Sequence, residues 1–574
     1  MRELEAAPSA RADLAAWRRE SGGNRFDHDS FLKRLLRRHL HERYAQWEPR
    51  LRQVAEVTGT EFAELVLESS RDGNLPVLRR HDADGRPGES VVFHPAYHAV
   101  GSVFWSSGVL AALAQPGSTV ASGAIAYLLD QQGEAGHACP VACTAGAIKL
   151  LQNLGTAEQQ SRYLPALLET DYDKRLHAAQ FVTEVQGGSD VGLNACRAEP
   201  ATDRPGWFRI SGEKWFCSVA DAGLFVVSAR HDPATSGTGG LGLFLVPRTI
   251  DGEPNGFSLR RLKSKLGTRS MATGEIEFAG ALGEPIGALE DGFRNLVGIV
   301  LDTSRVHNAL AVCGLMQGAS VVARLFAEKR RAFGQPIVDF PAVQETLARM
   351  RLRTACGLLT TFRILAMSDR LDTGGTDDEL AAARRIAVMI NKYWTSSAGT
   401  RTTREGIEIL GGNGTIEDFS SLPRLYRDAI VLESWEGTHN TLCAQVLRDF
   451  AKRELHGPWL RQVEAEIGDL GHPELTGHVT RARELHREVS DRIERLLGSD
   501  RQTAAAHIRH VVDRMCRLTD WLGLLTQAQW DLENTDGRET LDAIELYRLA
   551  ILDAADPQQS VEWVSLNRRL SRWI

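Results

Sequence analysis

The stretch from Leu432 to Asn440 places two carboxylates, a tryptophan and a glycine directly before an apolar helical pattern. Gly437 follows Glu436, and Thr438 is a residue type that favours the N-cap of a helix. We therefore expect Glu436 in a tight turn at a helix N-terminus. The helix dipole there favours the ionised carboxylate, whereas burial beside Trp435 favours the neutral acid. Such a carboxylate could act as a general base, although an acidic residue before a helix more often only caps it.

Apolar periodicity predicts helices at the start of the chain and a β domain after them. In residues 1–180 apolar side chains recur at helical spacing, and Thr156 to Gln159 has capping-box spacing. Residues 181–290 instead contain short alternating runs separated by Gly, Pro and Asp, which is typical of strands. These runs are residues 207–211, 224–229, 241–246 and 274–278.

Helical patterns return in residues 291–452 and continue to the C-terminus. Long helices are expected at residues 309–329, 342–370 and 378–400, and with the helix after Glu436 they suggest a four-helix bundle. Residues 453–574 show further helical periodicity. The predicted fold is mostly α with a central β domain. The four expected domains are residues 1–180, 181–290, 291–452 and 453–574.

Three short motifs look like cofactor or metal sites but lack the necessary context. Gly237 to Gly242 matches a dinucleotide fingerprint, yet it enters a predicted strand instead of a helix. Cys139 and Cys143, with Pro140 expected at a helix start, lack the second cysteine pair of a zinc site. His94 and His98 lack a third ligand. No metal site is therefore predicted.

Composition excludes several classes of function. The 574 residues carry a net charge of −7, which gives no footprint for nucleic acid or an anionic membrane. No apolar run approaches the roughly 20 residues needed to span a bilayer. Residues 1–20 show no secretory signal, so the eight cysteines are expected to be reduced thiols in a cytoplasmic protein.

Several motifs, taken in order, resemble those of one enzyme family. Val182 to Val191 contains Thr183-Glu184 followed by Gly188-Ser189-Asp190. It resembles the Thr-Glu-(x)n-Gly-Ser-Asp signature of the acyl-CoA dehydrogenase family. In that family the threonine and serine bond the flavin ring and the pyrophosphate, and glycines let backbone N–H groups approach phosphate oxygens. The resemblance gives Thr183, Gly188 and Ser189 these FAD-binding roles.

Gly212 to Ser218 resembles the family's Gly-x-Lys-x-Trp-Ile-Thr strand, which flanks the reactive edge of the flavin. Read without a gap, Phe216 takes the place of the tryptophan and Ser218 that of the threonine. A shift of one residue would instead put Cys217 in the threonine position. The resemblance therefore implies that Phe216 and Ser218 contact FAD in the ungapped register.

Asp302 to Arg305 resembles the start of the first bundle helix, whose aspartate and arginine lie along the acyl-CoA site. Arg305 could anchor a polar or anionic part of the substrate, because guanidinium is a fixed multidentate donor. Some relatives carry the base on this helix. Ser304 occupies that position here, so Glu436 has no rival as the base.

Two further segments imply contacts across a subunit interface. Arg330 to Pro336 resembles the family's Arg-x-x-Phe-Gly turn, in which the equivalents of Arg330 and Phe333 reach the FAD of a neighbouring subunit. Glu408 to Gly414 resembles the Gln-x-x-Gly-Gly-x-Gly loop, with Gly411 and Gly412 at the partner's pyrophosphate. A homo-oligomer, either a dimer or a homotetramer, is therefore expected.

Pro423 to Asp428 resembles the Arg-Asp step that leads to the family's base, and Glu436 follows eight residues after Asp428. Thr438 and Asn440 stand where the family again touches FAD. The resemblance covers residues 90–452. It implies that Glu436 removes the α-proton of an acyl-CoA or acyl-carrier thioester while the β-hydrogen leaves as hydride to flavin N5. An electron-transfer flavoprotein would then accept the electrons.

Trp435, Glu408 and the C-terminal extension are most similar to the branch that contains the bacterial alkylation-damage-response flavoprotein. That branch is associated with DNA binding through a basic C-terminal domain. Residues 451–574 here hold 17 Lys and Arg against 21 Asp and Glu, a net charge of −4, which argues against a nucleic-acid partner. Trp435 is expected to contact substrate. Four upstream residues are expected to narrow the pocket: Phe93, His94, Tyr97 and His98.

Two other functions stay open at this stage. The same fold hosts flavin monooxygenases and oxidases, which commonly lack the glutamate, so Glu436 favours dehydrogenation over them. The third hypothesis is a DNA-binding protein that protects against alkylation and has vestigial redox activity.

Overall fold

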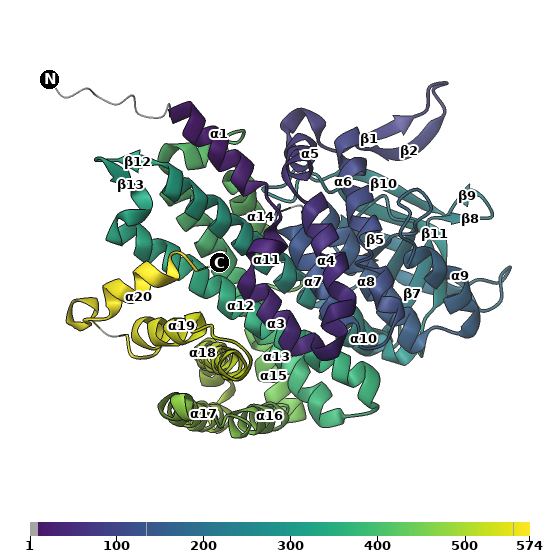
Figure 1. Ribbon diagram of the computed structural model, residues 1–574. Coiled ribbons are helices and arrows are strands. Elements are labelled where there is room, and N and C mark those ends of the chain that lie inside the picture. Colours follow the sequence, from purple (N-terminus) through teal and green to yellow (C-terminus); the bar gives the residue numbers. More distant parts are fainter. Residues whose placement is uncertain (1–9, 134, 555, 574) are drawn as a thin grey trace. The chain divides into compact units, whose positions relative to one another are not determined.

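A computed structural model describes residues 10–133, 135–554 and 556–573 (Figure 1). The chain forms two compact units, which are described separately. Unit 1 comprises Met1–Ala63, Pro116–Gly133 and Asn308–Ile574, and unit 2 comprises Glu64–Gln115 and Glu134–His307. Residues 1–9, part of the segment expected to lack a secretory signal, lie outside the described residues.

Unit 2 is built around a seven-stranded sheet. Its strand order is β10-β11-β5-β4-β6-β3, and β7 pairs with both β6 and β11. Strands β6 and β7 are apolar along almost their whole length and buried on both faces, so they form the core of the sheet. The main strands are β3 (Ala178–Phe181), β4 (Arg197–Pro200), β5 (Phe208–Ser218), β6 (Leu224–Arg230), β7 (Leu241–Pro247), β10 (Phe257–Leu262) and β11 (Thr273–Pro285), with short strands β8 (Thr249–Ile250) and β9 (Glu253–Pro254).

The four predicted strands are confirmed, and the glycine motif is not a dinucleotide site. Gly237–Gly240 forms a 3-10 turn that leads directly into β7, so the helix that would cradle a phosphate is absent there. The helices of unit 2 are α6 (Pro95–Ser106), α8 (Ala135–Leu154), α9 (Ala157–Leu167) and α10 (Gly292–Asn295). Thr156 and Gln159 form the expected capping box at the start of α9.

Two expectations for the N-terminal region are wrong in detail. Residues 77–92 form an antiparallel hairpin of β1 (Val77–His81) and β2 (Pro87–Val92), not a helix. Pro140 lies inside α8 instead of at its start. A proline removes the N–H that would bond the carbonyl four residues earlier. Here that carbonyl, on Gly136, accepts a hydrogen bond from the Tyr97 hydroxyl at 3.2 Å, so the helix continues.

Unit 1 contains the expected helical bundle, and its helices are longer than the sequence pattern predicts. The bundle helices are α11 (Asp302–Lys329), α12 (Pro341–Gly374), α13 (Asp378–Leu410), α14 (Leu422–Ser434) and α15 (His439–Arg453), with a small hairpin of β12 (Arg331–Ala332) and β13 (Gln335–Pro336). A π-helical turn, Leu296–Leu301, precedes α11. The first six residues of α11 belong to unit 2.

Helices from both ends of the chain pack on this bundle. At the N-terminal side, Trp17 donates its indole N–H to the Val322 carbonyl at 3.1 Å. The N-terminal helices are α1 (Ala10–Ser21), α2 (Arg25–His28), α3 (Ser30–Leu40), α4 (Tyr44–Val57), α5 (Thr60–Ser70), which continues into unit 2, and α7 (Thr119–Asp130).

The C-terminal extension is not a separate body but belongs to unit 1. Trp394 of α13 donates to the Asp520 carboxylate at 2.7 Å, and Tyr393 donates to Asp513 at 2.6 Å. Within unit 1, α16 and α18 pack against α13, and α17 packs against α16 and α18. The extension helices are α16 (His456–Gly468), α17 (Thr476–Leu497), α18 (Arg501–Asn534), α19 (Glu539–Tyr547) and α20 (Trp563–Leu570).

Two helical stretches are long and apolar enough to cross a membrane, Pro95–Ala114 and Leu289–Lys329. Their most apolar windows are 61% and 89% buried inside the protein, which is typical of core helices. They are therefore weak evidence for a membrane span. All eight cysteines are buried thiols.

Candidate active site

Glu436 lies in the short turn that joins α14 to α15, as the sequence predicts. Its backbone adopts a left-handed conformation with φ of 54°, and Gly437 follows with φ of 106°. Thr438 is the N-cap of α15, and its hydroxyl accepts a hydrogen bond from the Thr441 N–H at 3.4 Å. Left-handed backbone at a residue other than glycine costs of order 1–3 kcal/mol. The turn must therefore be held by its surroundings.

Contacts on both sides hold this turn. Lys392 of α13 is fully buried and donates from Nζ to the carbonyls of Glu433 and Gly437, both at 2.8 Å. Asn308 of α11 donates to the Leu432 carbonyl at 3.1 Å. Lys392 is not among the predicted site residues. The available signal for it was a lysine inside the apolar pattern of a long helix.

The residues that follow Glu436 contact other parts of unit 1. His439 lies 3.2 Å from the Ser396 hydroxyl and 3.7 Å from the Glu433 carboxylate. Burial lowers the pKa of His439, and the Glu433 carboxylate opposes that shift. The Asn440 side chain accepts a hydrogen bond from Arg509 of the C-terminal extension at 2.7 Å. Asn440, a predicted FAD contact, is thus also a link to α18.

In unit 2, the segment after β3 folds back on itself and brings three predicted site residues together. The Gly187 N–H donates to the Glu184 carbonyl at 3.0 Å, which closes a turn. Gly188 then lies so close to Thr183 that an added Cβ would be 2.5 Å from the Thr183 hydroxyl oxygen. Only glycine fits there without movement. Ser189 follows and is exposed.

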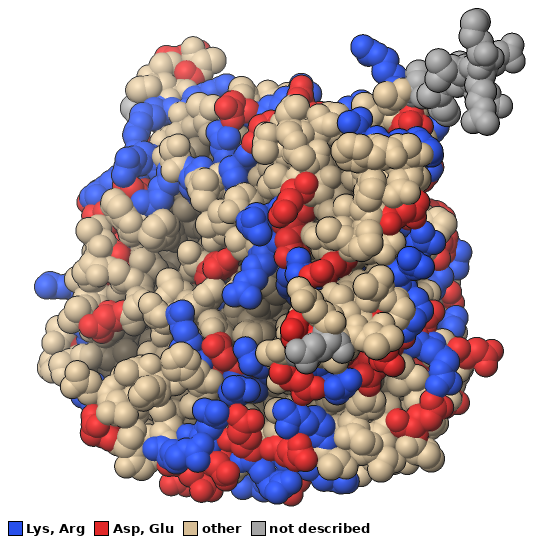
Figure 2. Space-filling model, turned by 90° about the vertical axis from the view of Figure 1, so that its left-hand side faces the viewer, with Lys and Arg blue, Asp and Glu red and all other residues tan. Residues whose placement is uncertain are grey.

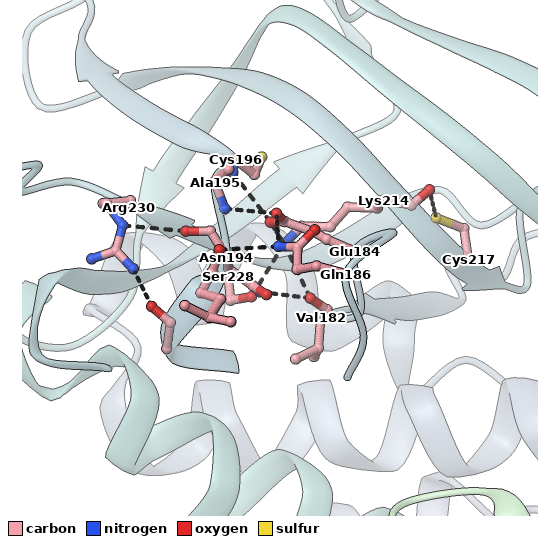
Figure 3. Close-up of polar contacts among 12 residues, drawn as sticks. Val182, Glu184, Gln186, Asn194, Ala195, Cys196, Lys214, Cys217, Ser228 and Arg230 are labelled. Atoms are coloured by element: carbon pink, nitrogen blue, oxygen red, sulfur yellow. Dashed lines mark hydrogen bonds and ion pairs between the residues drawn. The ribbon is translucent and has the colours of Figure 1, made fainter. Parts of the chain in front are cut away.

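A buried ion pair anchors this folded-back segment to the sheet (Figure 3). Lys214 of β5 is fully buried, and its Nζ lies 2.8 Å from the Glu184 carboxylate. The Ala195 and Cys196 N–H groups also donate to that carboxylate, at 2.6 and 3.2 Å. Burial alone would raise the pKa of Glu184, but Lys214 and these donors hold it below its ordinary value.

Two more side chains fix the remainder of the segment from Val182 to Cys196. Asn194 donates from Nδ2 to the Val182 carbonyl at 2.8 Å. Arg230, at the end of β6, donates to the carbonyls of Asn194 and Gly192 at 3.2 and 2.8 Å. In Figure 3 these groups surround the Glu184–Lys214 pair. Both ends of the segment are therefore bonded to the sheet.

Strand β5 presents its aromatic residues through a β-bulge. Lys214 and Cys217 of β5 pair with Ile276 and Gly274 of β11, so β5 carries one extra residue between them. Cys217 is fully buried, and burial raises the pKa of its thiol. Phe216, in contrast, is 54% exposed, and Ser218 is partly exposed. This geometry favours the ungapped register, with Phe216 and Ser218 accessible.

Backbone and side-chain bonds join β5 and α11 to the same segment. The Trp215 N–H donates to the Thr183 carbonyl at 2.9 Å. Gln180, three residues before Thr183, donates to the Ser304 hydroxyl at 3.0 Å. Asp302 and Arg305, the predicted substrate contacts, are both buried at this start of α11. The structure therefore gathers the predicted residues of unit 2 in one region.

The residues predicted to reach a neighbouring subunit are exposed. Phe333 stands at the tip of the β12–β13 hairpin with 98% of its surface accessible and φ of 50°. Arg330, next to the hairpin, is also exposed. The loop after α13 begins at Gly411, with φ of 60°, and a Cβ added at Gly411 or Gly412 would meet no atom within 4 Å. Its backbone is therefore open to a ligand.

Three of the four upstream residues expected to narrow the pocket, Phe93, Tyr97 and His98, are part of an aromatic cluster in unit 2. Phe93 stacks on Tyr97, with ring centroids 4.1 Å apart, and Tyr97 stacks on His137 at the same separation. Burial lowers the pKa of His137 to about 3, so this imidazole is neutral. His94 caps α6, and His98 contacts the Tyr172 hydroxyl at 3.1 Å. Within the described residues, no His, Cys, Asp and Glu cluster could hold a metal ion.

Comparison with known proteins assigns the family. Residues 290–450 match the acyl-CoA dehydrogenase C-terminal domain, residues 179–281 the acyl-CoA dehydrogenase middle domain, and residues 18–174 the adaptive response protein AidB N-terminal domain. AidB of Escherichia coli (strain K12) is 35% identical over 407 residues, which cover 67% of this chain and 72% of AidB. This chain belongs to the acyl-CoA dehydrogenase family.

A further relative and a solved structure agree with this assignment. Acyl-CoA dehydrogenase family member 11 of Caenorhabditis elegans is 36% identical over 326 residues, which cover 55% of this chain and 52% of that relative. The solved structure of C. elegans ACDH-11 in complex with C11-CoA aligns with a TM-score of 0.84 at 26% identity, covering 94% of this chain and 92% of that one. The predicted fold class, enzyme class and family are therefore confirmed.

FAD is the cofactor of this acyl-CoA dehydrogenase family member. The residues present fit such a group. Gly188 lets the backbone fold tightly over Thr183, and the open backbone at Gly411 and Gly412 offers N–H groups of the kind that bind phosphate oxygens. Phe216 offers an accessible aromatic face for stacking.

Proposed function

We propose that this enzyme removes two hydrogens from the α,β-carbon bond of an acyl-CoA thioester, with Glu436 as the base. One observation carries the proposal. Glu436 is a carboxylate on a left-handed turn whose two flanking carbonyls are bonded to a buried lysine. A capping role does not need this geometry, because Thr438 already caps α15.

The proposed reaction begins when the Glu436 carboxylate takes the α-proton and becomes a neutral carboxylic acid. FAD, when bound, would supply the hydride acceptor for the β-hydrogen. The thioester becomes an α,β-unsaturated thioester, so the proton and the hydride are both accounted for. Arg305 and Asp302, both buried at the start of α11, would orient a polar part of the thioester, because a guanidinium is a fixed multidentate donor.

The proposed FAD contacts are those that the family resemblance implies. Thr183, Gly188, Ser189, Phe216 and Ser218 would hold the flavin and its pyrophosphate, and Thr438 and Asn440 would contact FAD near the base. A neighbouring copy would contribute Arg330, Phe333, Gly411 and Gly412. Phe333 is accessible to a neighbouring copy, as the proposed homo-oligomer requires.

Acyl-CoA is the proposed substrate. Trp435, partly buried beside Glu436, would limit the size of its acyl group. An acyl-carrier thioester is the alternative substrate. We propose an electron-transfer flavoprotein as the acceptor of electrons and a cytoplasmic location, which suits eight buried thiols.

No nucleic-acid partner is proposed. Residues 451–574 have a net charge of −4. On the face drawn in Figure 2, Lys and Arg side chains are interspersed with Asp and Glu. Binding to duplex DNA depends on counterion release at a basic surface.

The test compares Glu436→Gln with Glu433→Gln in the FAD-loaded protein. Each variant is titrated without oxygen against a panel of acyl-CoA thioesters, and loss of oxidised-flavin absorbance is followed. Glu436→Gln should retain the yellow flavin and lose bleaching by at least about 10²–10⁴-fold, the usual contribution of a general base. Glu433→Gln, a carboxylate change three residues away, should bleach at nearly the normal rate. Bleaching that survives Glu436→Gln would reject Glu436 as the base.

A further inference from the structure

Lys392 is a buried cation that donates hydrogen bonds to the backbone of the Glu436 turn. Its side chain leaves the middle of α13 and is fully buried. Nζ donates to the Glu433 carbonyl and to the Gly437 carbonyl, each at 2.8 Å. These two carbonyls lie on opposite sides of Glu436 in the chain. One ammonium group therefore bonds both ends of the segment that carries the proposed base.

The position of the Glu433 carbonyl explains how a buried ammonium is tolerated. An unpaired buried charge costs several kcal/mol, so it requires strong partners. The Glu433 carbonyl belongs to the last turn of α14, which ends at Ser434. The last four carbonyls of a helix lack helical partners and carry the negative end of the helix dipole. Lys392 supplies the positive charge that this end favours.

The backbone of the turn shows what this bonding must maintain. Glu436 and Gly437 have φ of 54° and 106°. A left-handed residue other than glycine persists only where its surroundings enforce that conformation. With the Glu433 and Gly437 carbonyls both fixed on Nζ, the peptide between them has few alternative paths.

We propose that Lys392 is a positioning residue of this enzyme, which fixes the Glu436 turn so that the carboxylate is held for proton abstraction. Lys392 acts through the backbone on either side of the base, and it does not itself take the proton. The role rests on the proposed function of Glu436. Nothing in the sequence pattern near Glu436 points to it, because Lys392 lies more than forty residues earlier in the chain.

The decisive variant is Lys392→Met in the full-length, FAD-loaded protein. Methionine keeps an unbranched apolar side chain in the buried site but removes all donors to the two carbonyls. The limiting rate of anaerobic flavin reduction should fall by about 10²-fold, the usual effect of a small misplacement of a catalytic group. The thioester concentration that gives half the limiting rate should change by less than about threefold, because Lys392 does not contact the substrate in this proposal. The amount of FAD retained should also change by less than about threefold.

Arg385→Met provides a matched control on the same helix. Arg385 of α13 donates to the buried Asp449 of α15 at 2.7 Å, so its removal also strands a buried partner in the bundle. It makes no contact with the carbonyls of Glu433 or Gly437 among the described residues. Arg385→Met should lower the unfolding temperature about as much as Lys392→Met and keep the rate of flavin reduction. Equal rate losses in both variants would show that Lys392 has only a structural role.

Hydrogen exchange gives a readout that does not depend on activity. In Lys392→Met, amides of the peptide spanning residues 433–441 should exchange faster, whereas Arg385→Met should leave that peptide unchanged. Normal exchange there in Lys392→Met would overturn the inference. This measurement stays valid even if Glu436 is not the base, so failure of the proposed function and failure of this inference are distinguishable.

The double variant Lys392→Met/Glu436→Gln tests whether the two residues act together. If Lys392 acts only by positioning Glu436, the double variant should reduce flavin no more slowly than Glu436→Gln alone. If the double variant instead shows the product of the rate losses of the two single variants, the inference is overturned. If Lys392→Met does not fold, Lys392→Gln replaces it. The shorter glutamine carboxamide can form at most some of the hydrogen bonds that Nζ donates to the Glu433 and Gly437 carbonyls. A folded Lys392→Gln with the normal rate and normal exchange would also reject the role.

Discussion

Replacing Glu184 should destabilise the protein more than replacing Lys214, although the two residues form one buried ion pair. In Glu184→Gln, the fully buried Lys214 ammonium loses its carboxylate partner and is left with neutral acceptors, among them the Val182 carbonyl at 3.2 Å and the Ser228 hydroxyl at 3.4 Å. Removing one partner of a buried pair costs about 3–5 kcal/mol when the other charge is left uncompensated. We expect Glu184→Gln to lie in that range.

Lys214→Met should cost less, because the Glu184 carboxylate keeps other donors. The Ala195 and Cys196 N–H groups and the Gln186 amide donate to it at 2.6, 3.2 and 2.9 Å. A loss of about 1–3 kcal/mol, typical of one missing partner in a buried network, is expected. The double variant should cost less than the sum of the single variants, because each single change leaves an unpaired group.

The assay is urea unfolding of the FAD-free protein together with equilibrium binding of FAD. If the segment from Val182 to Cys196 must be ordered to bind FAD, a local loss of about 3 kcal/mol weakens binding by about 10²-fold. Glu277→Gln is the control. It breaks an exposed ion pair with Arg260 at 2.9 Å in the same unit and should cost less than about 1 kcal/mol. The reasoning is refuted if Glu184→Gln and Lys214→Met lower the free energy of unfolding equally. It is also refuted if Glu184→Gln lowers it as little as Glu277→Gln does.

Two further predictions concern pH and assembly. Burial raises the pKa of Asp520 to about 7. The unfolded chain releases this proton near pH 4, so stability should fall as pH rises from about 4 to about 7. Above pH 7, Asp520→Asn should therefore increase the free energy of unfolding by at most about 4 kcal/mol and raise the unfolding temperature. This gain should vanish near pH 4. Phe333→Ser should weaken the oligomer and release FAD together, as measured by light scattering after gel filtration with flavin absorbance. A Phe333→Ser monomer that retains FAD would contradict the shared site.

Local residue patterns were sufficient to predict the features that depend on neighbours in the chain. The Thr438 cap, the Gly437 turn, the strands β5 to β7 and the long bundle helices are each set by side chains within a few residues of one another. The order of short motifs identified the family, because it compares residue types at fixed positions and needs no distances. The roles of the individual site residues stay predictions.

Tertiary structure decided which distant groups meet. Glu184 and Lys214 are 30 residues apart in sequence, and Gln180 and Ser304 are 124 apart, so no periodicity links them. The extra residue in β5, visible only from its pairing with β11, favours Ser218 over Cys217 as the accessible side chain.

Glu436 shows the same division. The sequence places it in a turn before a helix, because glycine and an N-cap threonine follow it. The structure alone shows that the turn is left-handed and that Lys392 bonds both of its ends. The physical reason is that caps and turns are local, whereas a buried ammonium finds its partners only when separate helices pack.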